Sequence, residues 1–144
     1  MSLNWSTTGQ HANEGGIKVC VHGRPKVGKT RLIATAPRPL ILSAEKGTLS
    51  IAEVNIPLIQ IDSLNDLNEA YDWLKSSHDA KSFDTVCLDS ISEIGEKLLS
   101  EEKAKNNDPR KYYVEYQDKI SIQIRKFRDL ADKNTYFISK TELA

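Results

Sequence analysis

The chain has 144 residues, of which 39% are hydrophobic and 28% are charged, so it can bury one core and has no room for a second full domain. Its 20 basic and 20 acidic side chains cancel, and net charge therefore does not point to a nucleic acid or a membrane as partner. No apolar run approaches the length of a membrane span and no signal-peptide pattern is present, so we expect a cytoplasmic protein.

The first half of the chain predicts a leader and the start of an α/β domain. Residues 1–16 are polar and aperiodic, which predicts a flexible leader, with the folded domain over residues 17–144. The segment IKVCVHG, residues 17–23, is typical of a strand that enters a Gly-rich loop. A helix over residues 29–36 should follow and end before Pro37 and Pro39, and residues 39–45 then predict a second strand.

The second half alternates strand and helix patterns. Strands are predicted at residues 56–62, 83–90 and 134–140, and helices at residues 64–77, 91–105 and 113–132. Ser63 with Asp66 forms a plausible N-cap pair, and residues 106–111 predict a loop. The alternation predicts an α/β fold with a mostly parallel sheet between helical layers, a three-layer α/β/α arrangement. Cys20 and Cys87 both lie in strand-like apolar runs, where we expect two buried thiols rather than a metal site or a disulfide.

The segment GRPKVGKT, residues 23–30, fits the phosphate-binding pattern G-x-x-x-x-G-K-[ST] at every fixed position. Such a loop brings backbone N–H groups to a triphosphate, and Gly23 and Gly28 stand where a Cβ would collide with phosphate oxygens. Lys29 would reach the β- and γ-phosphates, and Thr30 would offer its hydroxyl to Mg²⁺. The residues expected to bind nucleotide are Gly23, Arg24, Pro25, Lys26, Val27, Gly28, Lys29, Thr30 and Arg31.

Two acids complete the predicted site. Asp89 ends the strand TVCLD and is expected to support Mg²⁺, although an Asp before SISE is also typical of a helix N-cap. ATP hydrolysis further needs a group that orients or deprotonates the attacking water. Glu45 closes the second strand and is the preferred catalytic base, because parallel strands deliver residues to the ligand edge of a sheet. Glu93 is the alternative base, and Glu45 could instead be a solvated loop residue beside Lys46.

The order GRPKVGKT, LILSAEKG, DTVCLDSISEI and TYFISKTE resembles the RecA-like ATPase core. It is more closely similar to the phage ATP-binding proteins of that class, which are associated with single-strand DNA recombination. The resemblance spans residues 17–142 and implies that the last strand lies between the loop strand and the Asp89 strand. It also implies that Ser139 and Lys140 stand where relatives carry a polar γ-phosphate sensor. Lys140 departs from the amide of better-known members.

The resemblance implies further partners. RecA-like cores act as oligomers that bind ATP at a subunit interface, so we expect a homo-oligomer. Single-stranded DNA would meet the loop NNDPRKYY, where Arg110, Lys111, Tyr112 and Tyr113 combine cations with stacking surfaces. An ordinary solvated loop is an equally good interpretation of these residues. Because relatives continue past the last strand, we expect the domain to be truncated on its C-terminal side.

Three rival functions fit the phosphate-binding loop. A GTPase is disfavoured, because Asp89 is followed by Ser-Ile-Ser rather than by a switch glycine. A small-molecule kinase would need a basic lid, and Arg110, Arg125 and Arg128 lie in a segment whose regular apolar stripe predicts a packed helix instead. A nucleotide-gated assembly or loader protein without enzymatic turnover stays an alternative to an ATP hydrolase.

Overall fold

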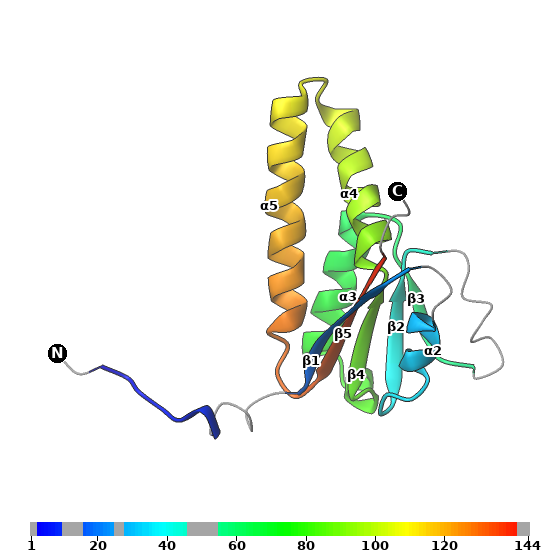
Figure 1. Ribbon diagram of the computed structural model, residues 1–144, viewed down its shortest axis with the longest axis vertical. Helices are drawn as coiled ribbons and strands as arrows, with labels where there is room; N and C mark the ends of the chain where they lie inside the picture. The colour runs from blue at the N-terminus through cyan, green and yellow to red at the C-terminus, as the bar shows by residue number, and fades with distance from the viewer. Residues whose placement is uncertain (1–2, 10–15, 25–27, 46–54, 141–144) are drawn as a thin grey trace.

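A five-stranded sheet with helices on both faces forms the described part of the chain (Figure 1). The structure is a computed structural model, and it describes residues 3–9, 16–24, 28–45 and 55–140. The strands are β1 (Lys18–Gly23), β2 (Pro39–Ser43), β3 (Leu58–Gln60), β4 (Thr85–Asp89) and β5 (Asn134–Lys140). The helices are α2 (Lys29–Ile33), α3 (Leu64–Ser76), the 3₁₀ turn η2 (Asp79–Ser82), α4 (Ile91–Lys105) and α5 (Pro109–Arg128).

The strand order is β1-β5-β4-β2-β3, and every pair in it is parallel. The expected α/β fold is therefore confirmed, including the position of the last strand between the loop strand and the Asp89 strand. Parallel pairing brings the carboxyl ends of all five strands to one edge of the sheet, which we call the carboxyl edge.

Side-chain alternation divides the core between the two faces of the sheet. On one face, Leu42, Val86, Leu88 and Phe137 pack with the buried side chains of α3, α4 and α5, among them Phe127. On the other face, Ile41, Cys87 and Ile138 pack with Ile33 of α2. Residues of one parity along each strand therefore face α2, and those of the other parity face the three long helices.

The helices α4 and α5 form a hairpin that extends past the carboxyl edge (Figure 1). α4 starts directly after β4 and runs away from the sheet, and with 15 residues it is about 22 Å long. The C-terminal half of α5 returns along the sheet, where Ile124 and Phe127 join the core. Gly95 permits close packing inside the hairpin, because a Cβ there would lie 3.0 Å from the Tyr116 hydroxyl. No helix among the described segments is both long and apolar enough to cross a membrane.

Four sequence expectations need correction. α2 ends at Ile33 rather than residue 36, and α5 begins at Pro109, capped by Asp108, rather than at residue 113. Cys20 is exposed, because it lies on the face of the edge strand β1 opposite α2, whereas Cys87 is buried as expected. Gly16, which the sequence places in the leader, packs against the domain, because a Cβ there would lie 2.2 Å from the backbone oxygen of Lys133.

Candidate nucleotide-binding site

The phosphate-binding segment joins β1, which ends at Gly23, to α2, which begins at Lys29. Pro25, Lys26 and Val27 lie outside the described residues, and for Lys29 and Thr30 only the backbone is described. α2 has five residues, so it offers less of a helix dipole than the longer helix expected from the sequence.

Gly28 adopts the left-handed backbone conformation at the start of α2, with φ 94° and ψ 13°. Among the described residues, a Cβ at this position would meet nothing within 4 Å. The glycine is instead explained by its positive φ, which costs an L-residue conformational energy. The Gly28 carbonyl accepts a hydrogen bond from the Leu32 N–H at 3.1 Å, which ties the turn to α2.

Asp89 ends β4 at the carboxyl edge and is 1% exposed. The N-cap of α4 is Ser90, whose Oγ accepts a hydrogen bond from the Glu93 N–H at 3.2 Å. Capping therefore does not explain Asp89, and the alternative interpretation of this residue as the N-cap is wrong. The peptide bond between Asp89 and Ser90 is cis.

The orientation of Asp89 follows from its strand. Cys87, two residues earlier, packs against Ile33 of α2, so strand alternation directs Asp89 to the same face. Burial raises the pKa of the Cys87 thiol to about 12, and the negative charge of Asp89 is the second cause. Asp89 therefore lies on the face of the sheet that carries the helix following the phosphate-binding loop.

Glu45 and Lys140 meet at this same edge. Lys140 is the last residue of β5, and its Nζ lies 2.5 Å from Glu45 Oε1. The Glu45 side chain is 16% exposed, so the interpretation of Glu45 as a solvated loop residue is not supported. The Glu45 backbone is held by Ser43, whose Oγ accepts from the Glu45 N–H at 3.3 Å and donates to the Glu45 carbonyl at 3.0 Å.

Sequence reasoning missed two serines, Ser43 and Ser92, that hold the backbone at this edge of the sheet. Ser43 is fully buried in β2, directly beside Asp89 in the register of the sheet. Ser92 Oγ accepts a hydrogen bond from the Lys140 N–H at 3.1 Å and so fixes the end of β5 to α4. The signal for Ser43 was a hydroxyl residue inside the apolar run LILSA, while nothing in the sequence links Ser92 to Lys140.

The two residues expected at the γ-phosphate sensor position face opposite ways. Lys140 lies two residues after Ile138 in β5, so its side chain points to the same face of the sheet, the α2 face, where it meets Glu45. Ser139 lies two residues after Phe137, so its side chain points to the face of the long helices, where its Oγ lies 3.1 Å from His22 Nδ1. Of these two residues, Lys140 therefore lies on the same face of the sheet as Asp89. Glu93 lies in the first turn of α4 and stays the alternative base.

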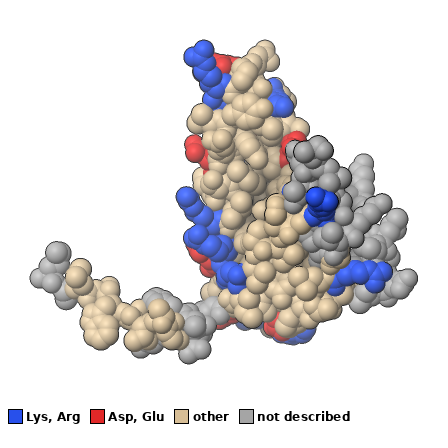
Figure 2. Space-filling view, viewed as in Figure 1, with Lys and Arg blue, Asp and Glu red and all other residues tan. Residues whose placement is uncertain are grey.

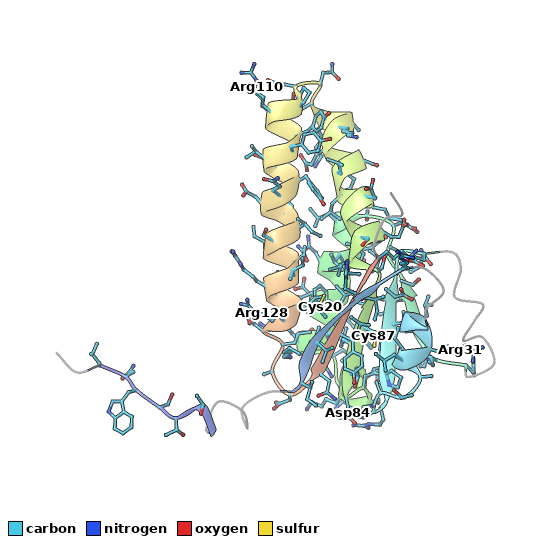
Figure 3. All side chains as sticks on the ribbon, viewed as in Figure 1. Cys20, Arg31, Asp84, Cys87, Arg110 and Arg128 are labelled. Atoms are coloured by element: carbon cyan, nitrogen blue, oxygen red, sulfur yellow. The ribbon has the colours of Figure 1, made fainter. Side chains whose placement is uncertain are left out.

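The remaining predicted nucleotide contacts, Arg24 and Arg31, are both exposed, and Arg31 lies on α2 (Figure 3). Among the segments that the structure describes, no group of three or more His, Cys, Asp or Glu side chains could hold a metal. Mg²⁺ bound to a nucleotide does not need such a group, because phosphate oxygens and waters supply most of its ligands. The buried carboxylate of Asp89 offers oxygen atoms, the kind of ligand that this cation prefers.

The residues proposed for DNA lie at the end of the α4–α5 hairpin, about 22 Å from the carboxyl edge along α4. They do not form a loop as expected: Arg110 to Tyr113 occupy the first turns of α5. The hairpin tip, defined as residues 103–113, carries exposed cations at Lys103, Lys105, Arg110 and Lys111. Figure 3 labels Arg110 at this end of the hairpin, and Figure 2 shows Lys and Arg side chains there. The rings of Tyr112 and Tyr113 lie 4.8 Å apart, and Lys103 Nζ lies 5.7 Å from the Tyr112 ring.

The fold and this edge define the class of protein: a P-loop nucleotide-binding domain with an α/β/α arrangement. Over residues 15–143 the chain matches a family described as an AAA domain, and it belongs to that family. Comparison with curated protein sequences finds no match.

Among solved structures, the fold is similar to the crystal structure of a KaiC-like protein from the hyperthermophilic archaeon Pyrococcus horikoshii OT3. The TM-score is 0.52 and the sequences are 16% identical. The match covers 88% of this chain and 62% of that one, so the chain spans less than two thirds of its structural neighbour. The likeness is one of fold, and it confirms the expected RecA-like sheet.

Proposed function

We propose that this domain binds ATP with Mg²⁺ and hydrolyses it. The observation that carries the proposal is the buried Asp89 carboxylate, which lies at the carboxyl edge on the same face as the helix that follows GRPKVGKT. Carboxylate oxygens are the ligands that Mg²⁺ prefers, and this carboxylate stands at the edge of the sheet where the loop would hold phosphates. Gly28 in its left-handed conformation turns the chain into α2 beside this edge.

The side chains would divide the reaction among them. Backbone N–H groups of residues 23–30 hold the phosphates, and Lys29 neutralises charge on the β- and γ-phosphates. Thr30 and Asp89 would hold Mg²⁺, and the bound ion would stabilise charge on the phosphoryl group in the transition state. Glu45 orients the attacking water and accepts its proton.

We further propose that the protein is a phage-type RecA-like ATPase that acts with single-stranded DNA in recombination or replication. Lys103, Arg110 and Lys111 at the hairpin tip supply phosphate contacts, and the partly exposed Tyr113 supplies a stacking surface. Assembly of several copies would complete each ATP site with residues of a neighbour, as in RecA-like proteins. A nucleotide-gated assembly or loader protein is the second candidate, because Lys140 engages the proposed base.

An ATPase assay with and without single-stranded DNA, run in parallel with GTP, tests the function. We expect hydrolysis of ATP that increases on addition of DNA. Lys29→Ala should abolish nucleotide binding or turnover, and unchanged ATP affinity would contradict the phosphate-binding assignment. Glu45→Gln should bind ATP and lose hydrolysis; if Glu93→Gln has that effect instead, the base is Glu93. Absence of turnover at every salt concentration, with ATP binding retained, would favour the loader.

The DNA contact is tested separately at the hairpin tip. The double variant Arg110→Ala with Lys111→Ala should lose the DNA-stimulated increase in turnover and lower the salt dependence of DNA binding. Lys81→Ala is the matched control, because Lys81 is an exposed lysine in η2, far from the tip in the fold. Equal DNA affinity of both variants would rule out the hairpin tip as the DNA contact.

A further inference from the structure

Helix α5 carries an excess of positive charge that the nucleotide site does not use. It has six basic and two acidic side chains, which gives it a net charge of +4, whereas the whole chain has 20 of each sign. Three of its cations, Arg125, Lys126 and Arg128, lie in its last turn, at the end away from the hairpin tip. Figure 2 shows Lys and Arg side chains at both ends of this helix. The positive charge is therefore concentrated on one element of a neutral protein.

Three arginines of α5 lie on one face of the helix, which we call the outer face. Arg128 follows Arg110 by 18 residues, which is five turns of 3.6 residues, and Arg125 lies one turn before Arg128. All three side chains are exposed, whereas Gln123 and Phe127, on the opposite side of α5, are buried. Figure 3 labels Arg110 at the hairpin tip and Arg128 near the other end of α5. The two arginines are about 27 Å apart along the helix axis.

These arginines are available for an anionic partner. Among the residues that the structure describes, neither Arg110 nor Arg125 forms a side-chain ion pair. Arg128 pairs with the adjacent Asp129 at 2.9 Å, but the two side chains are 53% and 64% exposed. An ion pair with this exposure contributes little free energy, so a phosphate group can replace the Asp129 carboxylate at low cost.

Exposed apolar side chains lie between the two ends of α5. Tyr113 is 44% exposed, Val114 55% and Ile122 52%. Unpaired bases can stack on a tyrosine ring and pack on aliphatic side chains, whereas a duplex keeps its bases inside and offers mainly phosphates to such a surface. Cations at both ends of the helix with apolar side chains between them therefore favour a single-stranded nucleic acid as the partner.

We propose that the outer face of α5 binds single-stranded nucleic acid along the whole helix, with the hairpin tip as one anchor and Arg125 with Arg128 as the other. This inference rests on the proposed contact with single-stranded DNA and adds a second anchor to it, beside the sheet. At 3.4 Å per nucleotide in a stacked strand, a track of 27 Å takes up about 8 nucleotides.

The test measures binding of labelled oligothymidylates by fluorescence anisotropy over a range of salt concentrations. One oligonucleotide has about 12 nucleotides and spans both anchors, and one has about 3 and reaches a single anchor. The double variant Arg125→Gln with Arg128→Gln should lose about tenfold in affinity for the longer strand, and much less for the shorter one. Its slope of log K against log salt should fall by about 1.4, because each phosphate contact on a single strand contributes about 0.7. Arg125→Lys with Arg128→Lys keeps the charge and should keep the slope.

Asp118 provides a test of opposite sign. It is exposed and lies two turns before Arg125, on the same side of α5 and about 12 Å from Arg110 along the axis. A strand that follows the helix passes this carboxylate, so Asp118→Asn should raise the affinity for the longer strand about twofold. A strand bound at the tip alone would be screened from it, because the Debye length in physiological salt is about 8 Å.

The matched control is Lys75→Gln with Lys81→Gln. It removes the same charge from exposed positions in α3 and η2, and we expect it to keep the wild-type affinity and salt slope. Thermal unfolding reports whether each variant folds. If the glutamine variant of Arg125 and Arg128 does not fold, Asp118→Asn and the lysine variant carry the test.

The outcomes separate this inference from the proposed function. Loss of binding in Arg110→Ala with Lys111→Ala, but wild-type affinity and slope in Arg125→Gln with Arg128→Gln, would overturn the second anchor and leave the contact at the tip. An equal loss in the control would show that general charge, and not the outer face, attracts the strand. Tighter binding of a duplex of the same length would overturn the choice of partner. Absence of DNA binding by wild type at low salt would overturn the proposed DNA contact itself.

Discussion

Replacement of Gly28 by alanine tests why a glycine stands at the start of α2. With φ at 94° and none of the described residues within 4 Å of an added Cβ, the expected cost is that of the left-handed conformation. That cost is about 1–2 kcal/mol for an L-residue. In a domain of this size it lowers Tm by about 3–8 °C. The turn cannot easily relax, because α2 is held by the fully buried Ile33 over Cys87.

The assay is urea and thermal unfolding of the nucleotide-free protein, with Gly28→Asn as the matched control. Asparagine adopts left-handed backbone more readily than alanine, so it should cost less although its side chain is larger. A larger loss of stability for asparagine than for alanine would refute the argument from φ and point to crowding. ATP affinity, measured on the same variants, then tests the separate expectation that a Cβ at this position collides with bound phosphate.

Three further predictions concern the surroundings of the site. Gly16→Ala should destabilise the domain by about 1–3 kcal/mol in urea unfolding, because the new Cβ would meet the Lys133 backbone; unchanged stability would mean that Gly16 belongs to the leader after all. A thiol reagent at pH 8 should label Cys20 rapidly and Cys87 only on unfolding, since Cys87 is buried and its pKa is raised to about 12; equal labelling rates would contradict this. Ser90→Ala should lower the free energy of unfolding by about 0.5–2 kcal/mol, because α4 loses its N-cap. A negligible loss of stability in thermal unfolding would mean that Asp89 is the N-cap instead.

Local patterns predicted the elements with clear periodicity or caps. The helix at Ile91–Lys105 and the strand at Asn134–Lys140 match their predicted ranges, and Ser63 caps α3 through the Asp66 N–H as expected. The start of α5 was missed, because NNDPRK contains breakers. Pro109 at the first helical position and Asp108 as cap instead begin the helix there.

Cys20 shows where local pattern fails. Its strand has the β-branched alternation of a buried strand, but whether both faces of a strand are covered depends on its place in the sheet, and β1 lies at an edge of the described sheet. The same limit applies to Asp89, whose sequence context fits both an N-cap and a metal ligand. The hydrogen bond from the Glu93 N–H to Ser90 rules out the cap, and the metal role of Asp89 stays a proposal.

The sequence by itself determined the class of the domain, because the phosphate-binding pattern, the strand periods and the strand-terminal acids are local features with fixed spacing. Tertiary structure alone decided which of these residues meet. Strand order brought Glu45 and Lys140, 95 positions apart in the chain, into an ion pair across β4. Because side chains alternate along β5, Lys140 points to the α2 face and Ser139 to the opposite face. Such contacts arise from the order and register of parallel strands, which no short segment of sequence encodes.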